Sequence, residues 1–119
     1  ILKARPEKMR IVLKQDKTHV AESRNVVATI EGTDPKLKKE VLVFSAHYDS
    51  VEFSDGAWDN MTGSITIMEL MHHFNENKPK RTLKFVWCGA EEIGGKGSAA
   101  YCEQHEDELK DIDSYKDLI

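Results

Sequence analysis

The sequence has 119 residues, which is enough for one domain of ordinary size. Hydrophobic residues make up 39% and charged residues 32% of it, the balance of a globular protein rather than a disordered chain. No apolar run approaches the roughly 20 residues of a membrane-spanning helix. The net charge is −4 and Lys36–Lys39 is the longest basic cluster, so the sequence predicts neither a membrane nor a nucleic-acid partner.

The ends of the sequence carry no recognisable processing signal. It opens at Ile1 without a basic and apolar leader, so no export signal is visible and the compartment stays undetermined. It closes on Leu118-Ile119, where an apolar stretch is expected to begin. We therefore expect residues 1–119 to form a single domain that is truncated at its carboxyl end.

Two short β-strands are predicted near the amino end. Residues 9–13 (Met-Arg-Ile-Val-Leu) and 25–30 (Asn-Val-Val-Ala-Thr-Ile) are apolar, and residues 15–18 between them resemble a turn. This pattern predicts an antiparallel hairpin.

The middle of the chain predicts a strand, a helix and a second strand. Residues 41–46 and 83–88 are nearly continuous apolar runs, typical of parallel strands covered on both faces. Residues 61–74 carry apolar side chains at helical spacing, and Asn60 or Thr62 is placed to cap this helix. Such a crossover connects parallel strands.

A further helix is predicted from about residue 97 toward residue 108, with Ser98 as its cap. The predicted fold class is therefore α/β, a mixed and largely parallel sheet flanked by helices, with an antiparallel edge. Ligands of such sheets bind at the carboxyl ends of the parallel strands.

Residues suited to a metal site follow those strand ends. His47 and Asp49 come after the first inner strand, Asp59 precedes the helix, and Glu91-Glu92 follows the second inner strand. Carboxylates gathered in this way repel one another unless they share a cation, and imidazole with carboxylates suits zinc. Asp49 is placed to accept the second ring N–H of His47. Of two adjacent glutamates, one can bind metal while the other takes a proton from a metal-bound water.

These motifs together resemble metallopeptidase family 28, from about residue 25 to residue 101. The segments that carry the resemblance are Asn25–Gly32, Ala46–Val51, Gly56–Gly63 and Gly89–Ser98. That family includes secreted bacterial two-zinc aminopeptidases and glutamate carboxypeptidase. The resemblance implies a zinc-exopeptidase fold of the phosphorylase/hydrolase type and a peptide substrate.

The resemblance also implies roles for single residues. His47 would ligate one zinc ion, Asp59 would bridge two, and Glu92 would ligate the other. Glu91 would be the general base that deprotonates the bridging water, and Asp49 would orient His47. The family completes its site with one Asp and one His further along the chain, for which no counterpart follows Glu92. We therefore expect a missing segment or a second chain to complete the site, and this chain alone to be inactive, with partial zinc occupancy or none.

Other histidines and aromatic residues have simpler interpretations. His72 and His73 are expected to be exposed near a helix end, and His105 to lie on an acidic, solvated helix. Tyr48 and Trp58 either line the substrate mouth or pack the loop.

Three functions are compatible with these residues. The first is an exopeptidase that removes the amino-terminal residue of peptides. The second is a non-catalytic binding or receptor domain on the same fold. The third is another two-zinc hydrolase, a carboxypeptidase or a deacylase.

Overall fold

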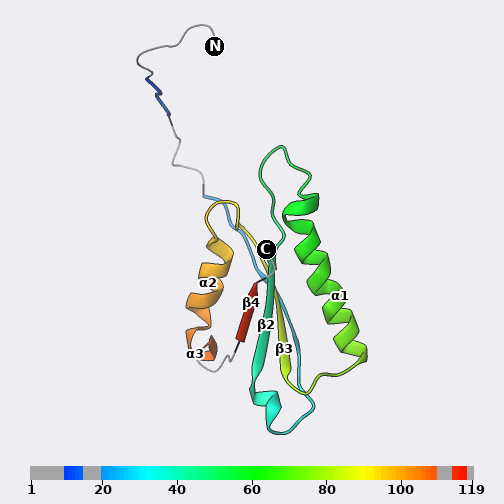
Figure 1. Ribbon diagram of the computed structural model, residues 1–119. Helices are drawn as coiled ribbons and strands as arrows, with labels where there is room; N and C mark the ends of the chain where they lie inside the picture. Colours follow the sequence, from blue (N-terminus) through cyan, green and yellow to red (C-terminus); the bar gives the residue numbers. More distant parts are fainter. Residues whose placement is uncertain (1–9, 15–19, 110–113, 118–119) are drawn as a thin grey trace.

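The structure, a computed structural model, describes residues 10–14, 20–109 and 114–117 (Figure 1). Its regular elements are β1 (Val26–Ile30), a 3-10 turn (Leu37–Lys39), β2 (Val41–His47), a π-type turn (Ala57–Met61), α1 (Thr62–Glu76), β3 (Thr82–Cys88), α2 (Lys96–Gln104), α3 (Glu106–Leu109) and β4 (Ser114–Asp117). No helix in these ranges is both long enough and apolar enough to cross a membrane.

The four described strands form one sheet in the order β1-β3-β2-β4. Strands β3, β2 and β4 are parallel, and β1 runs antiparallel along the outer side of β3. The predicted mixed, largely parallel sheet is thus confirmed. Helix α1 makes the crossover between β2 and β3, so the carboxyl ends of these two strands lie side by side at one edge, with His47 opposite Cys88.

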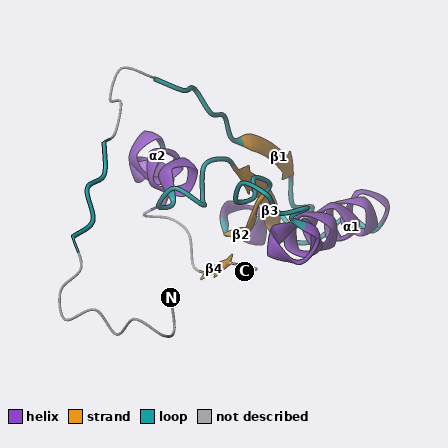
Figure 2. Ribbon diagram, turned by 90° about the horizontal axis from the view of Figure 1, so that it is seen from above, coloured by secondary structure: helices purple, strands orange, loops and turns teal. Residues whose placement is uncertain are grey.

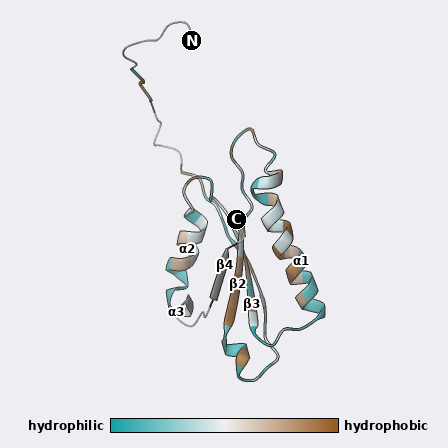
Figure 3. Ribbon diagram, in the orientation of Figure 1, coloured by the Kyte–Doolittle hydropathy of each residue, from teal (hydrophilic) through white to brown (hydrophobic). Residues whose placement is uncertain are grey.

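The sheet lies between two layers of helix, with α1 on one face and α2 on the other (Figure 2). Successive residues of β2 and β3 point to opposite faces, which is why most residues of both strands are apolar. Figure 3 shows this hydrophobic character along β2. On the face of the sheet toward α1, Phe85 belongs to a buried cluster with Ile67 of α1. On the other face, Val43 and Val86 are buried in a cluster with Tyr101 of α2.

Replacing Phe85 with alanine is expected to cost about 3–5 kcal/mol of unfolding free energy. Its side chain is 0% exposed, and its ring packs against those of Phe44 and Trp87, at centroid distances of 5.5 and 6.5 Å. Urea denaturation of the protein measures this loss. Phe53→Ala is the matched control, because Phe53 is 98% exposed, and it should change the same free energy by no more than about 0.5 kcal/mol.

The predicted amino-terminal hairpin is wrong as far as the described residues reach. Met9 and residues 15–18 lie outside them, while residues 10–14 form no strand, and Leu13 is 88% exposed. Strand β1 pairs with β3 instead, over five residues from Val26 to Ile30. The reason is physical: β3 is a fully buried strand that offers β1 a long, apolar neighbour, whereas residues 10–14 contain only three apolar residues.

Helices α1 and α2 are capped in different ways at their amino-terminal ends. Of the two candidate caps for α1, the structure selects Asn60, whose Oδ1 accepts the Gly63 N–H at 2.9 Å. Helix α2 instead has Gly95 as its N-cap residue, at a φ of 63° that suits glycine. The prediction of Ser98 as a cap is therefore wrong, because its hydroxyl lies inside the helix and donates to the Gly95 carbonyl.

The end of the described chain also differs from the prediction. Helix α2 stops at Gln104, and α3 is a separate short helix. Strand β4, which has the sequence Ser-Tyr-Lys-Asp, was not predicted because it lacks the apolar run that identifies β2 and β3.

Candidate metal centre

Two strand ends and one helix start bring the predicted site residues together. His47 is the last residue of β2 and is only 6% exposed. Glu91 and Glu92 follow β3, the parallel neighbour of β2, and Asp59 lies in the turn that leads into α1. The site therefore lies at the sheet edge where the topology predicted it.

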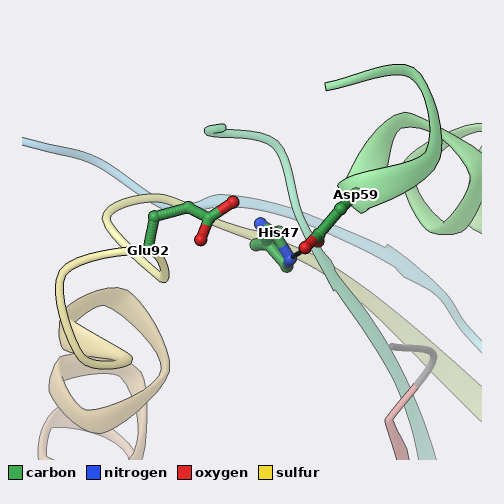
Figure 4. Close-up of side chains that lie close together, drawn as sticks. All are labelled: His47, Asp59 and Glu92. Atoms are coloured by element: carbon green, nitrogen blue, oxygen red, sulfur yellow. Dashed lines mark ion pairs between the residues drawn. The ribbon is translucent and has the colours of Figure 1, made fainter. Parts of the chain in front are cut away.

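One ligand atom from each of His47, Asp59 and Glu92 can be chosen so that all three lie within 4.8 Å of one another. In Figure 4 the carboxylates of Asp59 and Glu92 approach the imidazole from opposite sides. The Nε2 atom of His47 lies 2.9 Å from Asp59 Oδ1 and 3.7 Å from Glu91 Oε2. Within the described residues, this is the one group of three such side chains close enough to share an ion.

The imidazole of His47 is oriented from its other nitrogen. Nδ1 lies 3.0 Å from the main-chain oxygen of Asp49. Because a carbonyl oxygen only accepts hydrogen bonds, this contact requires the proton on Nδ1 and leaves the lone pair of Nε2 for a metal. The contact between Asp49 and the His47 ring runs through the main chain of Asp49, since its carboxylate oxygen is 3.7 Å from Nδ1, beyond hydrogen-bond distance.

The carboxylate of Asp49 has a different task. Its two oxygens accept the main-chain N–H groups of Glu91 at 3.1 Å and of Glu92 at 3.2 Å. Asp49 thus connects the loop after β2 to the loop that carries both glutamates. This contact could not be predicted from residue types, because the groups that Asp49 binds belong to the main chain.

The residues present fit zinc. Imidazole nitrogen and carboxylate oxygen are both common zinc ligands, and two ligands of a tetrahedral zinc ion stand about 3.3 Å apart, close to the 2.9 Å between His47 Nε2 and Asp59 Oδ1. A cavity of about 100 Å³ borders His47 and Glu91. The side chains of Asp59 and Glu91 are 66% and 46% exposed, so the site is open on one side.

Comparison with known protein families decides the assignment. The sequence model of peptidase family M28 matches residues 25–118. The chain belongs to peptidase family M28. The resemblance to metallopeptidase family 28 is therefore confirmed, and with it the classification of the chain among the metallopeptidases.

Among curated M28 relatives, a vacuolar membrane protease of Vanderwaltozyma polyspora is 40% identical over 69% of this chain, which corresponds to 8% of that protein. Carboxypeptidase Q of Xenopus laevis is 36% identical over 78% of this chain and 20% of its own length. The chain thus spans a fifth or less of these two relatives.

Solved structures of this family share the fold. An aminopeptidase from Aneurinibacillus sp. strain AM-1 superimposes with a TM-score of 0.74 at 33% identity, covering 79% of this chain and 23% of that one. A zinc aminopeptidase from Bacillus subtilis gives a TM-score of 0.71 at 32% identity, with the same shares covered.

The remaining histidines of this M28 chain do not join the site, as far as they are described. His72 and His73 are exposed on α1, as predicted, and His72 Nε2 lies 3.8 Å from Glu76. His105 was expected to be solvated but stacks on Tyr101 at a centroid distance of 4.3 Å.

Both aromatic residues near the site are exposed. The Tyr48 hydroxyl donates to the Arg24 carbonyl at 2.5 Å, and its side chain is half-exposed. Trp58 stands 84% exposed beside Asp59.

Proposed function

We propose that the complete protein is a zinc-dependent exopeptidase that removes the amino-terminal residue of peptides, with Glu91 as the general base. The observation that carries the proposal is the grouping of His47, Asp59 and Glu92 around one point, with Glu91 beside them, in a chain of peptidase family M28. The likeness to two solved aminopeptidases favours this reaction.

The proposed zinc ligands are His47, Asp59 and Glu92. We propose two ions, with Asp59 shared between them, as the family resemblance implies; the Asp59 carboxylate offers two oxygens and is largely exposed. One further Asp and one further His would come from outside these residues, either from another part of the complete protein or from a second chain. This chain covers only 23% of each matched aminopeptidase, so a complete protein of similar length would have further residues that could supply them. Bound zinc would polarise the scissile carbonyl and lower the pKa of water to about 7.

Glu91 takes the proton in the proposed mechanism. Its carboxylate is half-exposed and lies 3.7 Å from His47 Nε2, at the rim of the site. It accepts a proton from the attacking water as the new C–O bond forms. It then returns this proton to the leaving amine as the C–N bond breaks. Proton transfer by a positioned carboxylate contributes roughly 10²–10⁴-fold in rate.

A second candidate is a carboxypeptidase, which the 36% identity to carboxypeptidase Q favours. The two reactions differ in the end of the substrate that must be free. An aminopeptidase needs an unblocked amine, and a carboxypeptidase needs an unblocked carboxylate.

An assay of the complete protein on two substrates tests the proposal. The substrates are an amino-acid anilide with a free amine and an N-acetylated peptide with a free carboxyl end. We expect hydrolysis of the anilide only, its loss after chelation, and its recovery on addition of zinc. Cleavage of the acetylated peptide alone would establish the carboxypeptidase. Absence of hydrolysis in the zinc-loaded protein would contradict the proposal and favour a binding domain.

A further inference from the structure

The two glutamates of the site lie on a tightly folded segment, residues 89–97, which comprises the connection from β3 to α2 and the first two residues of α2 and is called the 89–97 loop below. Within it the Glu91 carbonyl accepts the N–H groups of Gly94 and Gly95, both at 2.8 Å, and the Ala90 carbonyl accepts that of Lys96 at 3.0 Å. These contacts set the shape of the loop. They do not by themselves set where the loop stands relative to His47, which belongs to another strand.

One side chain closes the base of this loop. The Asn25 Oδ1 accepts the Gly89 N–H at 3.1 Å, and the Asn25 Nδ2 donates to the Gly97 carbonyl at 2.8 Å. Gly89 is the first residue of the loop and Gly97 is the last. A single amide thus joins both ends of the segment that presents Glu91 and Glu92.

The sheet brings Asn25 to this place. Strand β1 runs antiparallel to β3 with Val26 opposite Trp87, so Asn25, the residue before β1, reaches the carboxyl end of β3. Its amide is suited to the task because it carries both an acceptor and a donor, and the loop offers one N–H and one carbonyl. The sequence could not reveal this contact, because the predicted partner of β1 was the wrong strand.

At the base of the loop, the main chain at Gly89 and Gly97 lies too close to its neighbours for a side chain at either position. A Cβ added at Gly97 would stand 2.2 Å from the Gly89 oxygen and 2.5 Å from Asn25 Oδ1. One added at Gly89 would stand 2.3 Å from Ser23 Oγ. Gly97 is therefore needed for the main chain to approach Asn25 so closely, and Gly89 for it to approach the residues just before Asn25.

The apex of the loop is held from the opposite direction, by the Asp49 carboxylate on the Glu91 and Glu92 N–H groups. Asp49 also sets the His47 ring through its carbonyl. Asn25 at the base therefore fixes the loop against the start of β1, and Asp49 at the apex fixes it against the segment that follows His47.

We propose that Asn25 is a positioning residue of the metal site, acting through the 89–97 loop on the placement of the Glu91 and Glu92 carboxylates. The inference rests on the proposed function for its catalytic consequence, and on the hydrogen bonds alone for its effect on the loop. Partners outside the ligand set typically affect metal affinity or activity by about 10–100-fold.

Asn25→Ala in the complete protein tests the proposal. We expect zinc affinity, measured by competition with a chelating dye, to fall by about 10–100-fold, and kcat to fall with little change in KM. Hydrogen exchange of the peptide spanning residues 89–97 should become faster. Asn25→Asp is the second variant, in case alanine prevents folding. It has the same shape and keeps an acceptor for Gly89, but it sets a carboxylate oxygen against the Gly97 carbonyl, so the same losses are expected.

Asn77→Ala is the matched control, because the Asn77 Nδ2 also donates to a main-chain carbonyl, that of His73, at the far end of α1. It should leave all three readouts unchanged. Wild-type zinc affinity in both Asn25 variants would overturn the proposal, even if the protein melts earlier or the loop exchanges faster. If the complete protein hydrolyses no peptide, the proposed function fails, while zinc affinity and exchange still decide the role of Asn25.

Discussion

Replacing Glu91 with glutamine is expected to lower kcat for peptide hydrolysis by about 10²–10⁴-fold while zinc stays bound. Glutamine keeps the size of the side chain but cannot accept the proton of the attacking water. The three proposed ligands are untouched, because Glu91 is not among His47, Asp59 and Glu92. Steady-state kinetics and elemental analysis of the same sample measure the two quantities.

The neighbouring glutamate makes this experiment sharper. Glu92→Gln should lower zinc affinity, because Glu92 is the member of the pair that contributes to the three-residue group. Glu69→Gln, on the exposed side of α1, is the neutral control. If Glu91→Gln loses zinc and Glu92→Gln keeps it, the roles of the two residues are reversed. Retained turnover in Glu91→Gln would remove the general base from the mechanism.

The parts of the fold that were predicted correctly from the sequence are the buried strands, because burial requires apolar residue types. Strands β2 and β3 are covered on both faces, so nearly every residue in them is apolar, and their ends were placed within one residue. Because both strands belong to one crossover, the residues after them had to meet at one edge. This is why the sequence predicts His47, Asp49, Asp59 and Glu91-Glu92 at one site, while the choice of His47, Asp59 and Glu92 as ligands came from the family resemblance.

The parts that the sequence missed depend on main-chain partners and on edge pairing. The residue types in Val26–Ile30 do not distinguish pairing with residues 10–14 from pairing with β3. The sequence of an edge strand does not specify which strand it pairs with. The contacts of Asp49 and Asn25 end on N–H groups and carbonyls, which every residue has. Strand β4 is short and has a polar sequence, so residue types do not identify it. It is recognised as a strand only from its parallel pairing with β2.

Replacing His47 with alanine in the complete protein is expected to abolish stoichiometric zinc binding and, with it, the zinc-dependent gain in stability. His47 is the one nitrogen ligand in the group and the one ligand that is buried. A ligand that binds only the folded state at 100 times its dissociation constant stabilises a protein by about 2.7 kcal/mol. Unfolding measured with and without zinc should show this increment in the wild type and not in His47→Ala.

His72→Ala is the control that separates a specific site from histidine chemistry in general. His72 lies on the exposed side of α1, 3.8 Å from Glu76, and takes no part in the three-residue group. It should retain the full zinc increment, because its removal leaves the orientation of His47 by the Asp49 carbonyl intact. An equal loss in both variants would place zinc elsewhere, and the assignment of His47 as a ligand would then be wrong.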